Sequence, residues 1–203
     1  MGRPSNTAER RAQIVAALLV VMSKDGFERA TIAAIGREAK LAPGLVHYHF
    51  TNKLEILVEL VEQLVARLDA RAAGLLASAA DAPRARLHAV VDAHVALGPD
   101  SDPRAVAAWV VIGAEAVRLV EVRTIYTRAV RGWLERLDGL VRAALRAEGR
   151  STRHTKRIAA AILSAVEGAY LLSAASPRTL PQGFAAPMLR RMTDGLLDAE
   201  GRA

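Results

Sequence analysis

Apolar residues recur every three to four positions along most of the chain, a spacing that places them on one side of an α-helix. In the first such segment, which is expected to end near Lys24, the inner side is formed by Ile14, Leu18, Val21 and Met22. No segment alternates apolar and polar residues as a half-buried strand does. The pattern therefore predicts an all-α fold.

Prolines, glycines and capping residues divide this pattern into nine predicted helices. Their expected ranges are about 7–24, 32–39, 43–50, 53–78, 83–97, 103–118, 122–147, 152–175 and 185–199. Ser151 or Thr152 is expected to cap the eighth helix, and the clearest loop is expected at 98–102. The sequence thus predicts a small three-helix head over residues 1–50 and a larger helical body over residues 51–203.

The stretch over residues 31–53, TIAAIGREAKLAPGLVHYHFTNK, predicts two short helices joined by a tight turn. Thr31 suits the N-cap of the first helix, and Pro43 suits the first position of the second. The second helix is only about two turns long, and its outward residues are Leu45, His47, Tyr48 and His49. Phenol and imidazole groups can bond phosphates and base edges, so this arrangement favours a helix in a DNA groove. A helical hairpin without a DNA role is the alternative.

This stretch resembles the helix-turn-helix of the TetR family of bacterial transcriptional regulators. The positions that match in register are Thr31, Ile32, Ile35, Ala39, Leu41, Gly44, Val46, His49, Phe50 and Lys53. The departures are Gly36, Lys40, Ala42, His47 and Leu54, and the turn at Lys40 is one that often needs a positive φ. The resemblance implies phosphate contacts from Thr31, Tyr48, His49 and Lys53. It implies that base contacts come mainly from Pro43, Leu45 and His47, with Gly44 at the same interface.

The formal net charge of +7 indicates an anionic partner, but the charge is not concentrated in the head. Residues 1–60 carry eight basic and six acidic side chains, whereas residues 118–157 carry eleven basic and four acidic ones. The second block is expected to be a solvated helix face. In the head, Arg3, Arg10 and Arg11 are expected either to reach the phosphate backbone or to be surface charges.

Residue patterns typical of catalysis or metal binding are missing from the sequence. There is no cysteine, no GxSxG or P-loop, and no HExxH spacing among the five histidines. We therefore expect that the protein is not an enzyme and that it binds no cofactor and no metal. The N-terminus lacks a signal-peptide core, and the apolar runs Ile14–Met22 and Ala105–Ala114 are too short to span a bilayer. A cytoplasmic protein without a membrane partner is expected.

Residues 105–145 resemble the TetR branch that includes regulators of choline and betaine metabolism, through Trp109, the pair Glu115-Ala116, Tyr126 and Trp133. The resemblance implies a cavity for a small-molecule inducer. Two ligand classes stay open: a quaternary ammonium compound in an aromatic cage, and an apolar or aromatic metabolite oriented by His94 or Glu115. The candidate pocket residues are Leu64, Leu68, Val91, His94, Trp109, Ile112, Glu115, Tyr126, Trp133 and Tyr170. The alternative is ordinary core or surface roles, with Arg118 pairing with Glu115.

The last two predicted helices carry apolar stripes and small residues. Their candidate interface residues are Ile158, Ile162, Ala165, Val166, Ala169 and Leu172 on the eighth helix, and Met188, Leu189, Met192 and Leu196 on the ninth. The family resemblance implies that these helices pair with the same two helices of a second subunit about a two-fold axis. Burial of the stripes within one subunit is the alternative.

The expected function is that of a homodimeric DNA-binding transcriptional regulator, a repressor that a small-molecule inducer releases from a palindromic operator. One alternative is a small-molecule-binding or scaffolding protein that has lost operator recognition. Another is a cofactor-free enzyme that uses the helical cavity. A specific footprint on DNA separates the first two hypotheses, and turnover of a bound metabolite would identify the third.

Overall fold

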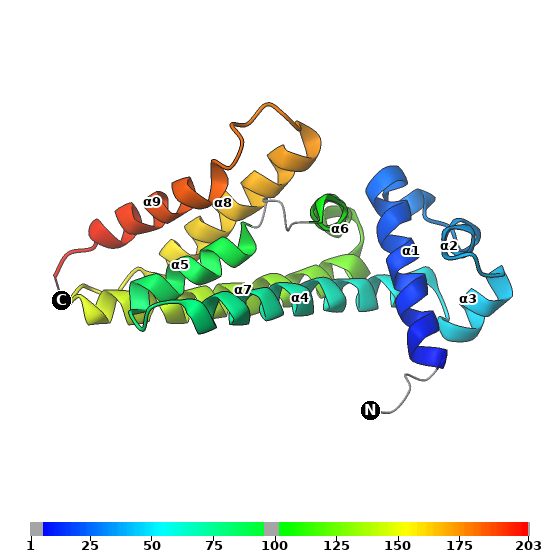
Figure 1. Cartoon of the computed structure of the whole chain (residues 1–203), viewed down its shortest axis with the longest axis horizontal. Helices are drawn as coiled ribbons and strands as arrows, with labels where there is room; N and C mark the ends of the chain where they lie inside the picture. Colours follow the sequence, from blue (N-terminus) through cyan, green and yellow to red (C-terminus); the bar gives the residue numbers. More distant parts are fainter. Residues whose placement is uncertain (1–5, 96–101, 203) are drawn as a thin grey trace. The chain divides into compact units, whose positions relative to one another are not determined.

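The computed structural model describes residues 6–95 and 102–202, and these residues form nine helices (Figure 1). The helices are α1 (Asn6–Arg29), α2 (Ile32–Ala39), α3 (Pro43–His49), α4 (Lys53–Ser78), α5 (Pro83–His94), α6 (Pro103–Arg118), α7 (Val120–Ala147), α8 (Thr155–Ala175) and α9 (Ala185–Asp198). Within the same residues the only β-type pairing is an isolated bridge between Arg150 and Arg202. The all-α prediction is confirmed. Arg3 and the predicted loop positions 98–101 lie outside the described residues.

Three helices begin directly after a residue whose side chain caps them. Thr31 Oγ1 accepts the Ala34 N–H at 3.1 Å, and Asp102 Oδ1 accepts the Arg104 N–H at 3.0 Å. Asn52 caps α4 in the same way. These bonds satisfy backbone donors that have no partner inside the first turn of a helix.

The start of α8 and the end of α1 differ from the ranges predicted from the sequence. The eighth helix begins at Thr155 rather than near Thr152, because the Ser151 N–H donates to the Gly201 carbonyl at 2.8 Å and holds that segment against the C-terminal residues. α1 continues to Arg29, but its backbone leaves the helical region at Gly26 (φ 79°, ψ 169°), where the sequence predicts an end. A positive φ is easiest for glycine.

The described chain divides into two compact units. Unit 1 contains Met1–Val65 and Asp102–Thr127, and unit 2 contains Ala66–Ser101 and Arg128–Ala203. Unit 1 therefore joins α1, α2 and α3 to the first half of α4, to α6 and to the start of α7. The boundary predicted at residue 50 separates a DNA-binding head from a ligand-binding and dimerisation body. This division by function stays a prediction.

In unit 1, α1 packs against α2, α3 and α6 (Figure 1). Its core includes the fully buried side chains Leu18, Met22, Ile35, Val46 and Phe50. These residues come from the inner sides of α1, α2 and α3 and from the residue after α3. The core thus fixes the two short helices on α1 and leaves the opposite side of α3 in solvent.

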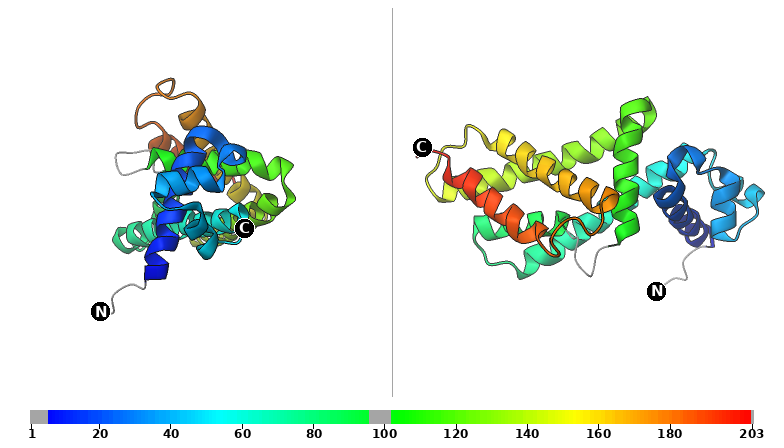
Figure 2. Two further views of the ribbon diagram at one scale, coloured as in Figure 1. Left: turned by 90° about the vertical axis from the view of Figure 1, so that its right-hand side faces the viewer. Right: turned by 90° about the horizontal axis from the view of Figure 1, so that it is seen from above.

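In unit 2, α8 and α9 run side by side (Figure 2, right), and α9 also packs on α5. By length and composition, α8 is apolar enough to cross a membrane. The two apolar runs considered from the sequence are shorter and do not include this segment. Here Ile158, Ile162 and Val166 on this helix are buried inside unit 2. These buried side chains make one side of α8 part of the core of unit 2.

Arg84 ties three helices of unit 2 together. Its guanidinium contacts Glu148 after α7 at 2.6 Å, and Asp194 and Asp198 on α9 at 3.0 and 2.9 Å. Hydrogen bonds from Arg84 hold the pKa of Glu148 and of Asp198 below their usual values. A carboxylate with a depressed pKa stabilises the fold above its unfolded pKa, and this contribution is lost as the pH falls through the folded pKa.

We expect Arg84→Met to lower the melting temperature at pH 7 by about 3 °C, because the ion pairs are partly exposed. At pH 3, closer to the lowered pKa values of Glu148 and Asp198, the difference from the natural protein should become smaller. Thermal unfolding at both pH values checks this, with the exposed Arg86→Met as control. An equal difference at pH 7 and pH 3 would show that Arg84 acts by packing alone.

Candidate nucleic-acid interface

The turn between α2 and α3 contains two of the residues that depart from the family pattern. Lys40 adopts the left-handed conformation (φ 55°, ψ 41°), as its position in the turn predicts. The Leu41 N–H donates to the Gly36 carbonyl at 2.8 Å. A Cβ at Gly36 would stand only 2.9 Å from the Leu41 carbonyl oxygen, so alanine there would require the turn to shift.

We expect Lys40→Gly to raise the free energy of unfolding by about 1 kcal/mol, because a side chain destabilises the left-handed conformation. Urea unfolding measures this effect. Lys40→Ala is the matched control, since it removes the charge but keeps a Cβ and should gain nothing. If both variants gave the same stability, the backbone conformation would not be the cause.

α3 exposes the residues that the sequence assigns to DNA. Tyr48 is 78% exposed and Leu45 37% exposed, and Pro43, Gly44 and His47 are exposed as well. Pro43 begins the helix, where its missing N–H costs nothing. This surface is short, polar and aromatic, and it is carried by a helix whose other side is anchored in the core.

His49 differs from its neighbours because it is half-buried. Its ring packs edge-on against the Tyr48 ring, with 5.0 Å between centroids. Its backbone carbonyl accepts a hydrogen bond from Arg11 Nη1 at 2.5 Å. His49 therefore supports the end of α3 and positions Tyr48, in addition to its predicted phosphate contact.

Arg11 has neither of the roles that the sequence suggests. Its guanidinium binds the Glu59 carboxylate on α4 at 2.6 Å and lies over the Phe50 ring, 3.9 Å from the centroid. Together with the bond to the His49 carbonyl, these contacts join α1, α3 and α4. The pair Glu55 and Glu59, one helical turn apart, is the sequence signal for this partner.

The side chain of Lys53 also binds residues of unit 1. Its Nζ donates to the Phe27 carbonyl at 2.7 Å and lies 4.1 Å from the centroid of the Phe27 ring. Burial lowers its pKa, whereas the carboxylates of Glu115 and Glu28 oppose that shift. The structure thus places Lys53 on the carbonyls that end α1, rather than free on the surface for a phosphate. Thr31 is exposed, and its hydroxyl oxygen already caps α2.

The ten predicted pocket residues divide equally between the two units. Unit 1 holds Leu64, Trp109, Ile112, Glu115 and Tyr126, and unit 2 holds Leu68, Val91, His94, Trp133 and Tyr170. In unit 1, the rings of Trp109 and Tyr126 lie 5.0 Å apart, and the Tyr126 ring covers Gly113. Arg118 pairs with Glu28 at 3.0 Å, so the alternative pairing with Glu115 is not observed.

In unit 2, His94, Trp133 and Tyr170 form a buried aromatic cluster. The rings of His94 and Trp133 are perpendicular, with 5.3 Å between centroids. The Tyr170 hydroxyl donates to the His94 backbone carbonyl, and burial raises the pKa of that hydroxyl. The cluster brings together side chains from α5, α7 and α8 that are far apart in the sequence.

Comparison with known proteins decides the family. A family model described as bacterial regulatory proteins of the tetR family matches residues 14–60. A second, described as the C-terminal part of BetI-type transcriptional repressors, matches residues 83–198, which is more than half of the chain. The chain belongs to the TetR family. It is a DNA-binding transcriptional regulator and not an enzyme.

Known proteins match this TetR-family chain over most of its length. The HTH-type transcriptional regulator BetI of Rhizobium meliloti (strain 1021) is 33% identical over 166 residues, which cover 80% of this chain and 76% of the relative. A regulator from Pseudomonas aeruginosa PAO1 superposes with a TM-score of 0.81 at 20% identity, over 98% of this chain and 97% of that one. A regulator from Saccharomonospora viridis, solved in complex with choline, gives 0.77 at 19% identity, over 96% and 100%. These two structures support the TetR fold.

The structure buries half of the residues predicted for the association surface of this TetR-family chain. Five of the ten predicted residues are buried in the core of unit 2, namely Ile158, Ile162, Val166, Ala169 and Leu189. Leu172, Met188 and Met192 are exposed, and Ala165 and Leu196 are half-buried. The stripe on α8 therefore faces the subunit's own core for the most part. Leu171, which the sequence does not single out, is 51% exposed on the same helix.

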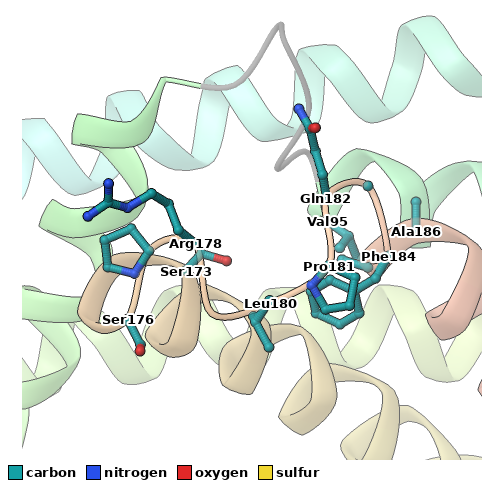
Figure 3. Close-up of a pocket in the computed structure, with 12 residues that line it drawn as sticks. Val95, Ser173, Ser176, Arg178, Leu180, Pro181, Gln182, Phe184 and Ala186 are labelled. Carbon is teal, nitrogen blue, oxygen red and sulfur yellow. The ribbon is translucent and has the colours of Figure 1, made fainter.

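A surface pocket of about 410 Å³ lies beside the connection between α8 and α9 (Figure 3). Its walls are mainly apolar, and the polar ends of Arg178 and Gln182 lie well apart. A small-molecule site in a TetR-family regulator needs polar groups that converge on the ligand. None of the ten predicted pocket residues lines this cavity.

Proposed function

We propose that this regulator is a homodimeric repressor that binds a palindromic operator through α3 and is released by a small-molecule inducer. The exposed face of α3 carries the proposal, because Tyr48, His47 and Leu45 project into solvent from a helix that is fixed on its other side. Such exposure of aromatic and apolar side chains costs free energy unless a partner covers them.

The contacts proposed for the DNA follow from the position of each side chain. Tyr48 and Thr31 offer hydroxyl donors for phosphates, and Pro43, Leu45 and His47 face the bases. Two heads related by a two-fold axis would contact half-sites roughly 34–36 Å apart, or a multiple of that spacing. Lys53 is left out of this set because its ammonium group already binds α1.

The proposed dimer uses the exposed apolar residues of α8 and α9. Leu171, Leu172, Met188 and Met192 are exposed on two helices that lie side by side. Burial of such side chains against the same surface of a second subunit would satisfy the two-fold symmetry that a palindromic operator requires. The neighbouring residues of α8 and α9 that are buried in unit 2 would hold these exposed side chains in place.

For the inducer, we propose a small organic cation and choose choline as the first probe. The support is the match to the BetI-type repressor model, the choline complex of the Saccharomonospora viridis regulator, and the buried aromatic ring of Trp133 beside His94 in this chain. Aromatic faces attract quaternary ammonium groups. The inducer would act by preferring one state of the protein, because only differential affinity shifts an equilibrium.

Selection of bound duplexes from a random DNA pool, at near-physiological salt, tests the DNA part of the proposal. A recovered palindrome with two matched half-sites supports a sequence-specific dimer. Binding without a consensus that disappears as salt rises would mean contact with phosphates alone. A small-molecule-binding protein that has lost operator recognition would then be the better description. Release of the selected operator by choline tests the inducer.

A further inference from the structure

His94 is a buried histidine with one ring nitrogen left without a partner. The residue is only 2% exposed, and its Nδ1 lies 2.9 Å from the Val90 carbonyl oxygen, one turn earlier on α5. A carbonyl only accepts hydrogen bonds, so Nδ1 carries the ring proton and donates it. Nε2 is then an acceptor, and no donor reaches it among the residues that the structure describes.

The surroundings keep this imidazole neutral. Burial lowers the pKa of His94, and the positive charge of Arg136 acts in the same direction, although the hydrogen bond to Val90 and the carboxylate of Asp69 oppose the shift. Arg136 is itself paired with Asp69. A neutral ring with a proton on Nδ1 presents a lone pair at Nε2.

The hydroxyl of Tyr170, another member of the cluster, already has an acceptor. The Tyr170 hydroxyl donates to the backbone carbonyl of His94 and so cannot serve the ring of the same residue. A buried acceptor without a donor costs free energy, and native proteins seldom leave one. A donor from outside the described residues would satisfy Nε2.

We propose that the inducer donates an O–H or N–H hydrogen bond to His94 Nε2, and that this contact selects ligands with a donor over those without one. The inference rests on the proposed function, because it assumes an inducer bound at the His94 cluster. It narrows the ligand class, since an alcohol such as choline supplies a donor. A carboxylate such as glycine betaine offers only lone pairs to the lone pair of Nε2.

The experiment compares alcohols with their methyl ethers, which keep the body of the molecule, lose the donor and add one methyl group. Four such pairs, with trimethylammonium, dimethylamino, cyclohexyl and phenyl bodies, are titrated calorimetrically into the full-length protein, with choline and O-methylcholine as the first pair. At least one alcohol should bind about 10- to 100-fold more tightly than its ether. Glycine betaine should bind more weakly than choline.

His94→Phe is the matched variant, because phenylalanine fills a similar volume and keeps the ring contact with Trp133. In this variant the preference for the alcohol should disappear. Circular dichroism verifies folding, and the comparison of alcohol and ether in the natural protein decides the question even if the variant does not fold. Equal binding of every pair, or no binding of any compound, overturns the proposal.

Operator release separates this inference from the proposed function. An alcohol that binds through His94 but does not release the selected operator supports the contact and contradicts the inducer role. Release by alcohols and ethers at equal concentrations supports the inducer role and overturns the contact. An alcohol preference that survives in folded His94→Phe also overturns it, because another acceptor would then be responsible.

Discussion

Replacing Arg11 with alanine is expected to lower the free energy of unfolding by about 2–3 kcal/mol, because charge-assisted hydrogen bonds and a cation–π contact are lost together. The guanidinium joins the Glu59 carboxylate, the His49 carbonyl and the Phe50 ring. Its removal leaves the end of α3 without this link to α1 and α4. Operator binding should therefore weaken at least about tenfold, even at a temperature where the protein remains folded.

Urea unfolding and operator titration measure the two effects of Arg11→Ala. Arg10→Ala is the matched control, since Arg10 is the neighbouring residue and its guanidinium bonds only to Gln13 on the same helix among the contacts described. It should leave both quantities nearly unchanged. If Arg10→Ala weakened operator binding and Arg11→Ala did not, Arg10 would be the phosphate contact and the structural role of Arg11 would be wrong.

Replacing Tyr48 with alanine should weaken operator binding by about 10- to 100-fold, as expected for a lost hydrogen bond to a charged phosphate together with the ring contact. The side chain is 78% exposed, so the free energy of unfolding should change by no more than about 0.5 kcal/mol. Fluorescence anisotropy with the selected operator and urea unfolding give the two numbers.

Tyr48→Phe divides the effect between the hydroxyl and the ring. The phenylalanine variant keeps the edge-on contact with His49 and loses only the donor. An intermediate affinity would assign part of the binding to a phosphate. An alanine variant with natural affinity would remove Tyr48 from the interface, whereas a large loss of stability would show that it supports the fold instead.

The starts of α2, α4 and α6 were predictable because their causes are local. Thr31, Asn52 and Asp102 each cap a helix with a side-chain oxygen two or three residues from the donor it accepts. The left-handed backbone of Lys40 was predictable for the same reason, since the turn imposes it. Such features depend on a few neighbouring residues, and a single sequence contains them in full.

The partners of long polar side chains were not predictable, because they depend on packing. Arg11 bonds to a residue 48 positions later, and Arg84 to one 110 positions later. Helical spacing shows that Ile158 and Ile162 share a face of α8, but it does not show whether that face meets the subunit's own core or a second subunit. In the structure both residues are buried in the core of unit 2.

The packing of α1 on α6 limits how this regulator can be recombined with others. Unit 1 is built from two stretches, Met1–Val65 and Asp102–Thr127, which are not adjacent in the gene. A hybrid made at a single junction after residue 50 would give α1 a foreign α6 and would lose the pair between Glu28 and Arg118. Exchange of DNA specificity by fusion therefore requires both stretches to move together, or substitutions confined to the exposed face of α3.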